Sequence, residues 1–333
     1  MGKVIIGTSV VVLIFGGMSA KAQTPKSPEL KVLDHLVGSW RNESVVTQAN
    51  GDEEESTDTS VAKWSLQGRH IEERGTDSDG KETFLGLWTY DSDAGVYKTW
   101  IFAPNLPIPI PATLQWDESK KTLAGKGDLG NGITMQITLW RIDNDRSEST
   151  ATMKDASGNV LFDFKGKSFR KSDRLPIESP KAQTPKSLEL KVLDRFVGSW
   201  RLEQVERQAN GDEEKGTATL VTKWSLQGRY IEIRATDSDG KEGALELWTY
   251  DSDAGVYKMW FFDSNSPEPK RGTLRWNESK KTLTSANEDV GNGITGQLSV
   301  RFIDNDRTEY TVTAKDASEN VVFETKGKLS RKK

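Results

Sequence analysis

The feature that most constrains the fold of this chain is a long internal repeat, because its second half reproduces its first half. The segment Val37-Gly-Ser-Trp-Arg41 recurs as Val197-Gly-Ser-Trp-Arg201, and the segment from Leu87 to Lys98 recurs from Leu247 to Lys258. The copies are offset by 160 residues before Leu123 and by 161 after it. Stacking repeats have periods of roughly 20–50 residues, so each copy is expected to be a whole domain.

The N-terminus predicts an export signal. Lys3 supplies a positive charge, residues 4–17 are apolar, and Ala20-Lys21-Ala22 matches a cleavage site of small residues. The apolar stretch is shorter than the roughly 20 residues of a membrane-spanning helix. We therefore expect a periplasmic or secreted protein with no integral membrane span after cleavage.

The repeat also predicts the domain boundaries. A signal peptide at residues 1–22 precedes a first domain at 28–171, a linker at 172–187 and a second domain at 188–333. The linker is rich in proline, serine and charge, which is typical of a short extended connector.

Within each copy, apolar and polar residues alternate with a period of two, which is typical of strands. The clearest run has apolar Ile133, Met135, Ile137 and Leu139 between polar residues. Clusters of Asp, Asn and Gly separate such runs at hairpin spacing. A long antiparallel meander with no helices to cover it must close on itself or split into two packed sheets. We predict an all-β chain of two tandem antiparallel up-and-down barrels, with about ten strands each.

A short helical turn is predicted before the first strand of each copy. In the first copy, Ser27 and Pro28 suit an N-cap and a first helical position. Leu30, Leu33 and Leu36 follow at roughly helical spacing. One or two turns of helix could close one mouth of the barrel.

The ordered motifs of each copy resemble a family of uncharacterised bacterial secreted domains with a lipocalin-like (calycin-type) barrel. The similar features are the run Pro-Glu-Leu-x-x-Leu-Asp-x-x-Val-Gly-x-Trp at 28–40, the pair Gly68-Arg69, and the Tyr90-Asp91 turn before Val96-Tyr97. The resemblance covers nearly all of both copies. It implies a barrel with a small-ligand cavity and no particular activity.

Composition excludes several kinds of site. The chain has no cysteine and only two histidines, His35 and His70, whose counterparts in the second copy are Arg195 and Tyr230. A cation and a phenol cannot replace an imidazole ligand, so we expect no metal and no haem or other cofactor shared by both copies. The net charge is −4 with no basic stripe, which argues against nucleic acid as a partner.

Tryptophan is the residue type that points to a candidate site, because ten of the eleven are paired between the copies. One interpretation is core packing. The other is an apolar pocket with one arginine, suited to an amphipathic ligand that carries a carboxylate. The candidate residues are Trp40, Trp64, Arg69, Tyr97 and Trp100 in the first copy and Trp200, Trp224, Arg229, Tyr257 and Trp260 in the second.

The copies diverge in one apolar segment. Leu106, Ile108 and Ile110 stand among prolines where the second copy has polar residues, and Trp140 is replaced by Arg301. We predict that this added apolar surface contacts the second domain or another chain.

Three function classes remain. The first, which we favour, is non-catalytic binding of a small apolar or amphipathic ligand inside a barrel. The second is an interaction or structural protein whose barrels are filled by side chains. The third is a hydrolase-type enzyme that uses carboxylates such as Glu43 and Glu203. We expect no enzyme, because the copies share no histidine, cysteine or metal set for acid–base or nucleophilic chemistry.

Overall fold

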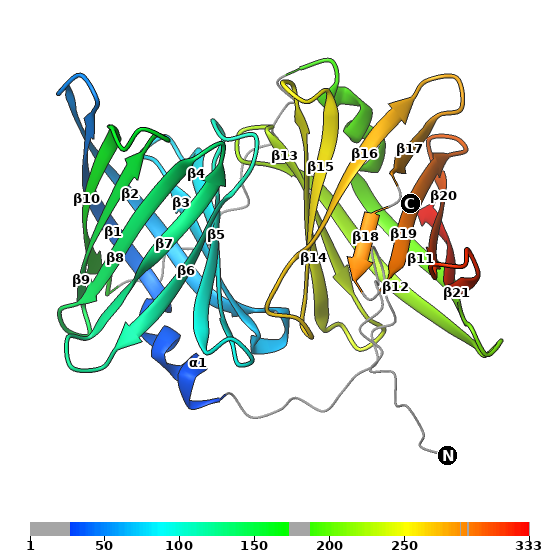
Figure 1. The fold of residues 1–333 in the computed structure, drawn as a ribbon, viewed down its shortest axis with the longest axis horizontal. Coiled ribbons are helices and arrows are strands. Elements are labelled where there is room, and N and C mark those ends of the chain that lie inside the picture. The colour runs from blue at the N-terminus through cyan, green and yellow to red at the C-terminus, as the bar shows by residue number, and fades with distance from the viewer. Residues whose placement is uncertain (1–26, 173–186, 287, 292, 333) are drawn as a thin grey trace.

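The computed structural model describes residues 27–172, 187–286, 288–291 and 293–332, and it contains two β-barrels in tandem (Figure 1). The predicted all-β fold is confirmed. The predicted signal peptide and almost all of the predicted linker lie outside the described residues. The strands of the first barrel are β1 (Gly38–Gln48), β2 (Glu53–Ser65), β3 (His70–Thr76), β4 (Glu82–Asp91), β5 (Val96–Phe102), β6 (Ile110–Asp117), β7 (Thr122–Gly130), β8 (Ile133–Arg141), β9 (Arg146–Lys154) and β10 (Val160–Arg170).

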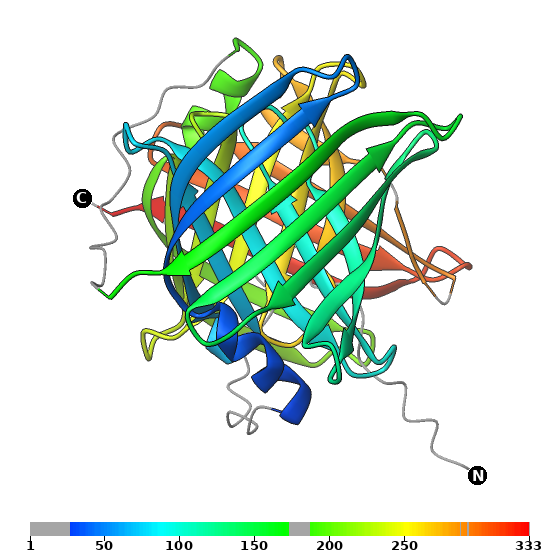
Figure 2. The ribbon, with the colours of Figure 1, turned by 90° about the vertical axis from the view of Figure 1, so that its left-hand side faces the viewer.

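The first barrel is an up-and-down meander. Each strand pairs antiparallel with the next one in the chain, and β1 pairs with β10 to close the barrel. Figure 2 shows these tilted strands from the outside. Closure leaves no free edge that could pair with another chain. The predicted alternation is confirmed on β8, where Met135, Ile137 and Leu139 face the core of the barrel.

The second barrel repeats this order with one interruption. Its strands are β11 (Gly198–Gln208), β12 (Glu213–Ser225), β13 (Tyr230–Thr236), β14 (Glu242–Asp251), β15 (Val256–Asp263), β16 (Lys270–Asn277), β17 (Thr282–Ser285), β18 (Glu288–Gly291), β19 (Ile294–Phe302), β20 (Arg307–Lys315) and β21 (Val321–Arg331). The segments β17 and β18 take the place of the single strand β7. Both pair with β19, which closes this barrel as well.

A helical segment covers one end of each barrel. In the first copy, α1 (Pro28–Val32) continues into the 3-10 helix η1 (Leu33–Leu36), and Ser27 Oγ accepts a hydrogen bond from the Leu30 amide at 3.3 Å. The second copy has a 3-10 helix, η3 (Leu190–Phe196), and a further short one, η2 (Leu66–Gly68), precedes β3. Among the described residues, no helix has the length and apolarity needed to cross a membrane.

The two barrels pack against each other through an apolar layer on the outer faces of β3 to β5 and β13 to β15. Its buried members come from both copies at matching positions: Leu66, Leu85, Leu87, Trp100 and Phe102 with Leu226, Tyr230, Leu245, Leu247, Trp260 and Phe262. Because each side contributes the same positions, the contact has the form of a two-fold symmetric dimer interface.

Buried ion pairs repeat this symmetry. Arg74 donates to Glu232 at 2.6 Å, and its counterpart Arg234 donates to Glu72 at 2.8 Å. Both arginines also pair with the glutamate two residues before them in their own strand. Every one of these glutamates is therefore held by cations from both barrels, as buried charges require.

Candidate ligand site inside the first barrel

Six of the ten predicted site residues hold the helical segments in place. In the first copy, Trp40 Nε1 donates to the Leu36 carbonyl at 2.7 Å, and Trp64 Nε1 donates to Asp34 at 2.8 Å. Tyr97 Oη donates to the Glu29 carbonyl at 3.0 Å. Trp200, Trp224 and Tyr257 make the same three bonds in the second copy. These aromatic side chains close one barrel end, which accounts for their presence in both copies.

Trp100 and Trp260 do not face the barrel interior, contrary to the prediction. On β5, Tyr97 faces inward and Trp100 lies three residues later, so the two side chains point to opposite faces of the strand. Both tryptophans belong to the layer between the barrels and line a cavity of about 300 Å³ there. The Trp100 indole N–H is buried, and no described residue accepts a hydrogen bond from it.

The predicted arginines are also placed differently from the expectation. Arg69 precedes β3, and burial lowers the pKa of its guanidinium. Asp91 of its own barrel and Asp263 of the other barrel act in the opposite direction, so the side chain lies near the contact between the barrels. The Nε atoms of Arg69 and Arg229 are both buried, and neither has a hydrogen-bond partner within the described parts of the chain. The predicted pocket with an inward arginine is thus not assembled.

The divergent apolar segment does contact the second barrel. Ile108 packs against the layer between the barrels, and the Leu106 carbonyl accepts a hydrogen bond from Tyr230 Oη at 2.8 Å. Ile110 instead packs into the core of the first barrel. Trp140 lies half-buried on the outer face of β8, opposite Glu148 of β9.

The histidines and carboxylates considered as candidate metal ligands or acid–base residues do not lie together. His35 is half-buried near Trp116, with their ring centroids 6.2 Å apart, and His70 is completely buried between the barrels. Glu43 pairs with Arg41 in an exposed position. Within the described residues, no group of three or more His, Cys, Asp or Glu side chains could hold a metal ion.

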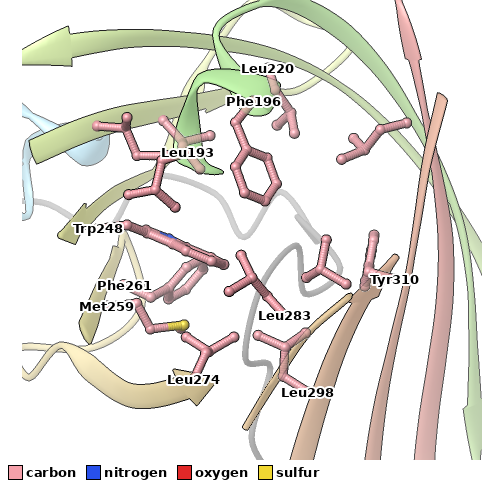
Figure 3. Packing of buried hydrophobic residues seen from close by; sticks show 14 of the residues in the cluster. Leu193, Phe196, Leu220, Trp248, Met259, Phe261, Leu274, Leu283, Leu298 and Tyr310 are labelled. Atoms are coloured by element: carbon pink, nitrogen blue, oxygen red, sulfur yellow. The ribbon is translucent and has the colours of Figure 1, made fainter. Parts of the chain in front are cut away.

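The interior of the second barrel is largely filled. Figure 3 shows Trp248, Met259, Phe261 and neighbouring leucines converging on one apolar cluster. Toward the end opposite η3, Tyr310 Oη donates to Gln204 Oε1 at 2.6 Å. A cavity of about 600 Å³ borders this pair and the adjoining parts of β11, β12, β20 and β21.

The interior of the first barrel differs at the matching positions, which carry smaller or more polar side chains. Asn42 and Ser149 replace the buried Leu202 and Tyr310 of the second barrel. Likewise, the first barrel has Ser44, Ile101 and Ser168 where the second has Gln204, Phe261 and Leu329. All five residues of the first barrel are half-buried, whereas all five counterparts are buried. These inward-facing side chains are therefore more exposed to solvent in the first barrel than in the second.

A polar network lies in this accessible interior. Asn42 Nδ2 donates to Asp58 Oδ1 at 2.7 Å and to Ser60 Oγ at 3.2 Å. Ser60 Oγ donates to Glu73 Oε1 at 2.9 Å. This network was not predicted, although the sequence carries a signal for it: Asp58 and Glu73 stand at inward positions of their strands, where an alternating pattern requires apolar residues.

No protein-family model and no curated protein sequence matches the chain. Among solved structures, it is similar to a protein of unknown function from the DUF3598 family of Nostoc punctiforme. The two sequences are 10% identical, the match covers 92% of this chain and 100% of that chain, and the TM-score is 0.32. An S-type phycobiliprotein lyase from Guillardia theta matches with 13% identity over 46% of this chain and 97% of its own, at a TM-score of 0.34. Each copy is an antiparallel up-and-down barrel with a helical segment at one end.

Proposed function

We propose that this chain binds a small amphipathic molecule, without catalysis, inside its first barrel. The second barrel would act mainly as the structural partner that packs against the first. On the evidence of the N-terminal sequence, we further propose that binding takes place in the periplasm or outside the cell.

One observation carries this proposal: matching inward positions are half-buried and small in the first barrel but buried and large in the second. Duplicate domains begin with equal interiors, so these differences at inward positions indicate different uses. The interior combines apolar residues such as Met135 and Ile137 with the polar network of Asn42 and Asp58. Ligand pockets typically have this composition, mostly apolar with a few placed polar groups.

The interaction-protein alternative fits the second barrel, whose core is filled by side chains. The enzyme alternative has less support, because Glu43 forms an exposed pair with Arg41, and Glu203 with Arg201.

A neutral fluorescent probe tests the proposal. We expect N-phenyl-1-naphthylamine to bind the full chain, and Ser149→Tyr to weaken this binding about tenfold or more, because the phenol would occupy space that Tyr310 fills in the second barrel. Glu148→Tyr on the outer face of the same strand is the matched control and should bind like the wild type.

Native mass spectrometry of the chain purified from a bacterial host complements the titration. We expect one small molecule per chain, lost on denaturation, and a protein mass that lacks residues 1–22. Unchanged probe binding by Ser149→Tyr would refute a site in the first barrel.

A further inference from the structure

The polar network of the first barrel contains two carboxylates that converge from different strands. Asp58 lies on β2 and Glu73 on β3, and the side chains of Asn42 and Ser60 connect them. Asp58 is half-buried, and so is Glu73. We call these four residues the Asp58–Glu73 cluster.

Within the part of the chain that the structure describes, neither carboxylate has an ion-pair partner. Burial raises the pKa of Asp58, more than the hydrogen bond from Asn42 lowers it, and nearby Asp77 raises it further. Burial also raises the pKa of Glu73, more than the hydrogen bonds from Ser60 and Trp88 lower it, and Asp58 adds to the rise. Two adjacent carboxylates in a partly desolvated place are costly without a cation, so the cluster favours a positively charged partner.

A buried donor lies beside the cluster. Trp88 is 8% exposed, and its indole N–H is close enough to the Glu73 carboxylate to lower the pKa of that group, although it makes no hydrogen bond of normal geometry to any described residue. In the second barrel, the counterpart Trp248 donates to Glu246 at 2.8 Å. The first barrel has Gly86 in place of Glu246, and a Cβ at Gly86 would lie 3.2 Å from Trp88 Nε1 and 3.8 Å from Glu73 Cβ. Gly86 thus removes the acceptor that the second barrel offers, and the indole N–H turns toward the cluster instead.

The cluster is particular to the first barrel. Its four residues correspond in the second barrel to apolar side chains, namely Leu202, Ala218, Leu220 and Ile233. A buried polar group destabilises a fold unless it makes hydrogen bonds. The second barrel, which has the same fold, carries apolar residues at these positions. The structure of a barrel therefore does not require the cluster, and a ligand gives it a use.

We propose that the Asp58–Glu73 cluster binds the cationic head group, in particular a protonated amine, of the amphipathic ligand. This inference rests on the proposed function and replaces the carboxylate ligand expected from Arg69. The amine would donate to the carboxylates of Asp58 and Glu73. An organic cation fits better than a metal ion, because the described residues offer no group of three or more metal-ligating side chains.

Three probes of equal chain length and different head group test the inference: decylamine, decanol and decanoate. Each is titrated at pH 7 against the full chain loaded with N-phenyl-1-naphthylamine, and probe displacement is measured. We expect decylamine to bind about tenfold or more tightly than decanol, because a charge-assisted hydrogen bond in a desolvated site is stronger than a neutral one. Decanoate should bind most weakly, because it adds a third negative charge.

Two variants locate the effect. Glu73→Ile installs the residue of the second barrel, and Asp58→Asn keeps size and hydrogen bonding but removes the charge. Both should lower decylamine affinity to about that of decanol while decanol affinity stays unchanged. Glu148→Gln on the outer surface is the control for net charge and should leave all three affinities unchanged.

The outcomes separate the two proposals. If the three molecules displace the probe equally from the wild type, the head-group inference is wrong while binding in the barrel stands. If the probe binds the wild type but none of the three displaces it, the inference is wrong as well. If the probe itself does not bind, the proposed function fails.

Discussion

At the scale of single residues, His70 occupies an unusual place between the barrels, because neither of its ring nitrogens has a hydrogen-bond partner among the described residues. Its ring lies edge-on to the Phe262 ring, with their centroids 5.8 Å apart. The counterpart of His70 in the second copy, Tyr230, donates a hydrogen bond to the Leu106 carbonyl. Burial, followed by the charge of Arg69, lowers the pKa of His70 to about 3. The imidazole is therefore neutral in the folded protein at every pH near neutrality.

This depressed pKa predicts an acid-sensitive contact between the barrels. The unfolded chain takes up a proton near pH 6.5 and the folded chain only near pH 3, so stability is lost as the pH falls through that window. We expect the wild type to lose about 2 kcal/mol relative to His70→Phe between pH 7 and pH 5, measured by urea unfolding. Parallel pH profiles of the two proteins would contradict this.

At the scale of elements, alternation in the sequence predicts the strands and which residues of each strand face the core. The prediction for Trp100 was wrong because β4 and β5 carry apolar residues on both faces, and Trp100 lies on the outer one. Leu85 and Leu87 alternate with inward Gly86 and Trp88, and strands with two apolar faces are buried on both sides. That signal was present in the sequence. The pairing of Arg74 with Glu232 was not, because nothing local reports which outer faces meet.

The helical segments give the prediction that belongs to this scale. Leu33 and its counterpart Leu193 are both completely buried under their barrels. Each Leu→Ala change should cost about 2–5 kcal/mol, and Leu193→Ala should cost more, because a filled interior relaxes less around a new cavity than a solvent-accessible one. Urea unfolding followed by tryptophan fluorescence measures both. Leu188→Ala, at a residue 75% exposed, is the control, and equal costs for Leu33 and Leu193 would argue against different interiors.

At the scale of the whole molecule, the duplication has produced a two-fold contact within one chain. Ser65 donates to Glu242 and Ser225 donates to Glu82, both at 2.9 Å, so each hydrogen bond is matched by its symmetric partner. A contact of this kind is self-complementary, and apart from the exchange of His70 for Tyr230 and the segment around Leu106 it has stayed symmetric while the interiors have diverged. A largely retained contact face and divergent inner faces are what one expects when the second barrel holds the first and the first binds the ligand.

This view predicts that the barrels stay together without a covalent connection. A protease site placed within residues 173–186 would allow the chain to be cut after folding, and the two halves should then co-elute in size-exclusion chromatography. Arg74→Glu should separate the cut halves, because it puts a fourth carboxylate beside Glu72, Glu82 and Glu232 in a buried place. The symmetric change Arg234→Glu should act equally, whereas Arg41→Glu at an exposed pair should have no effect. If the cut wild-type halves separate, the contact depends on the linker and the second barrel is not a structural partner of the first.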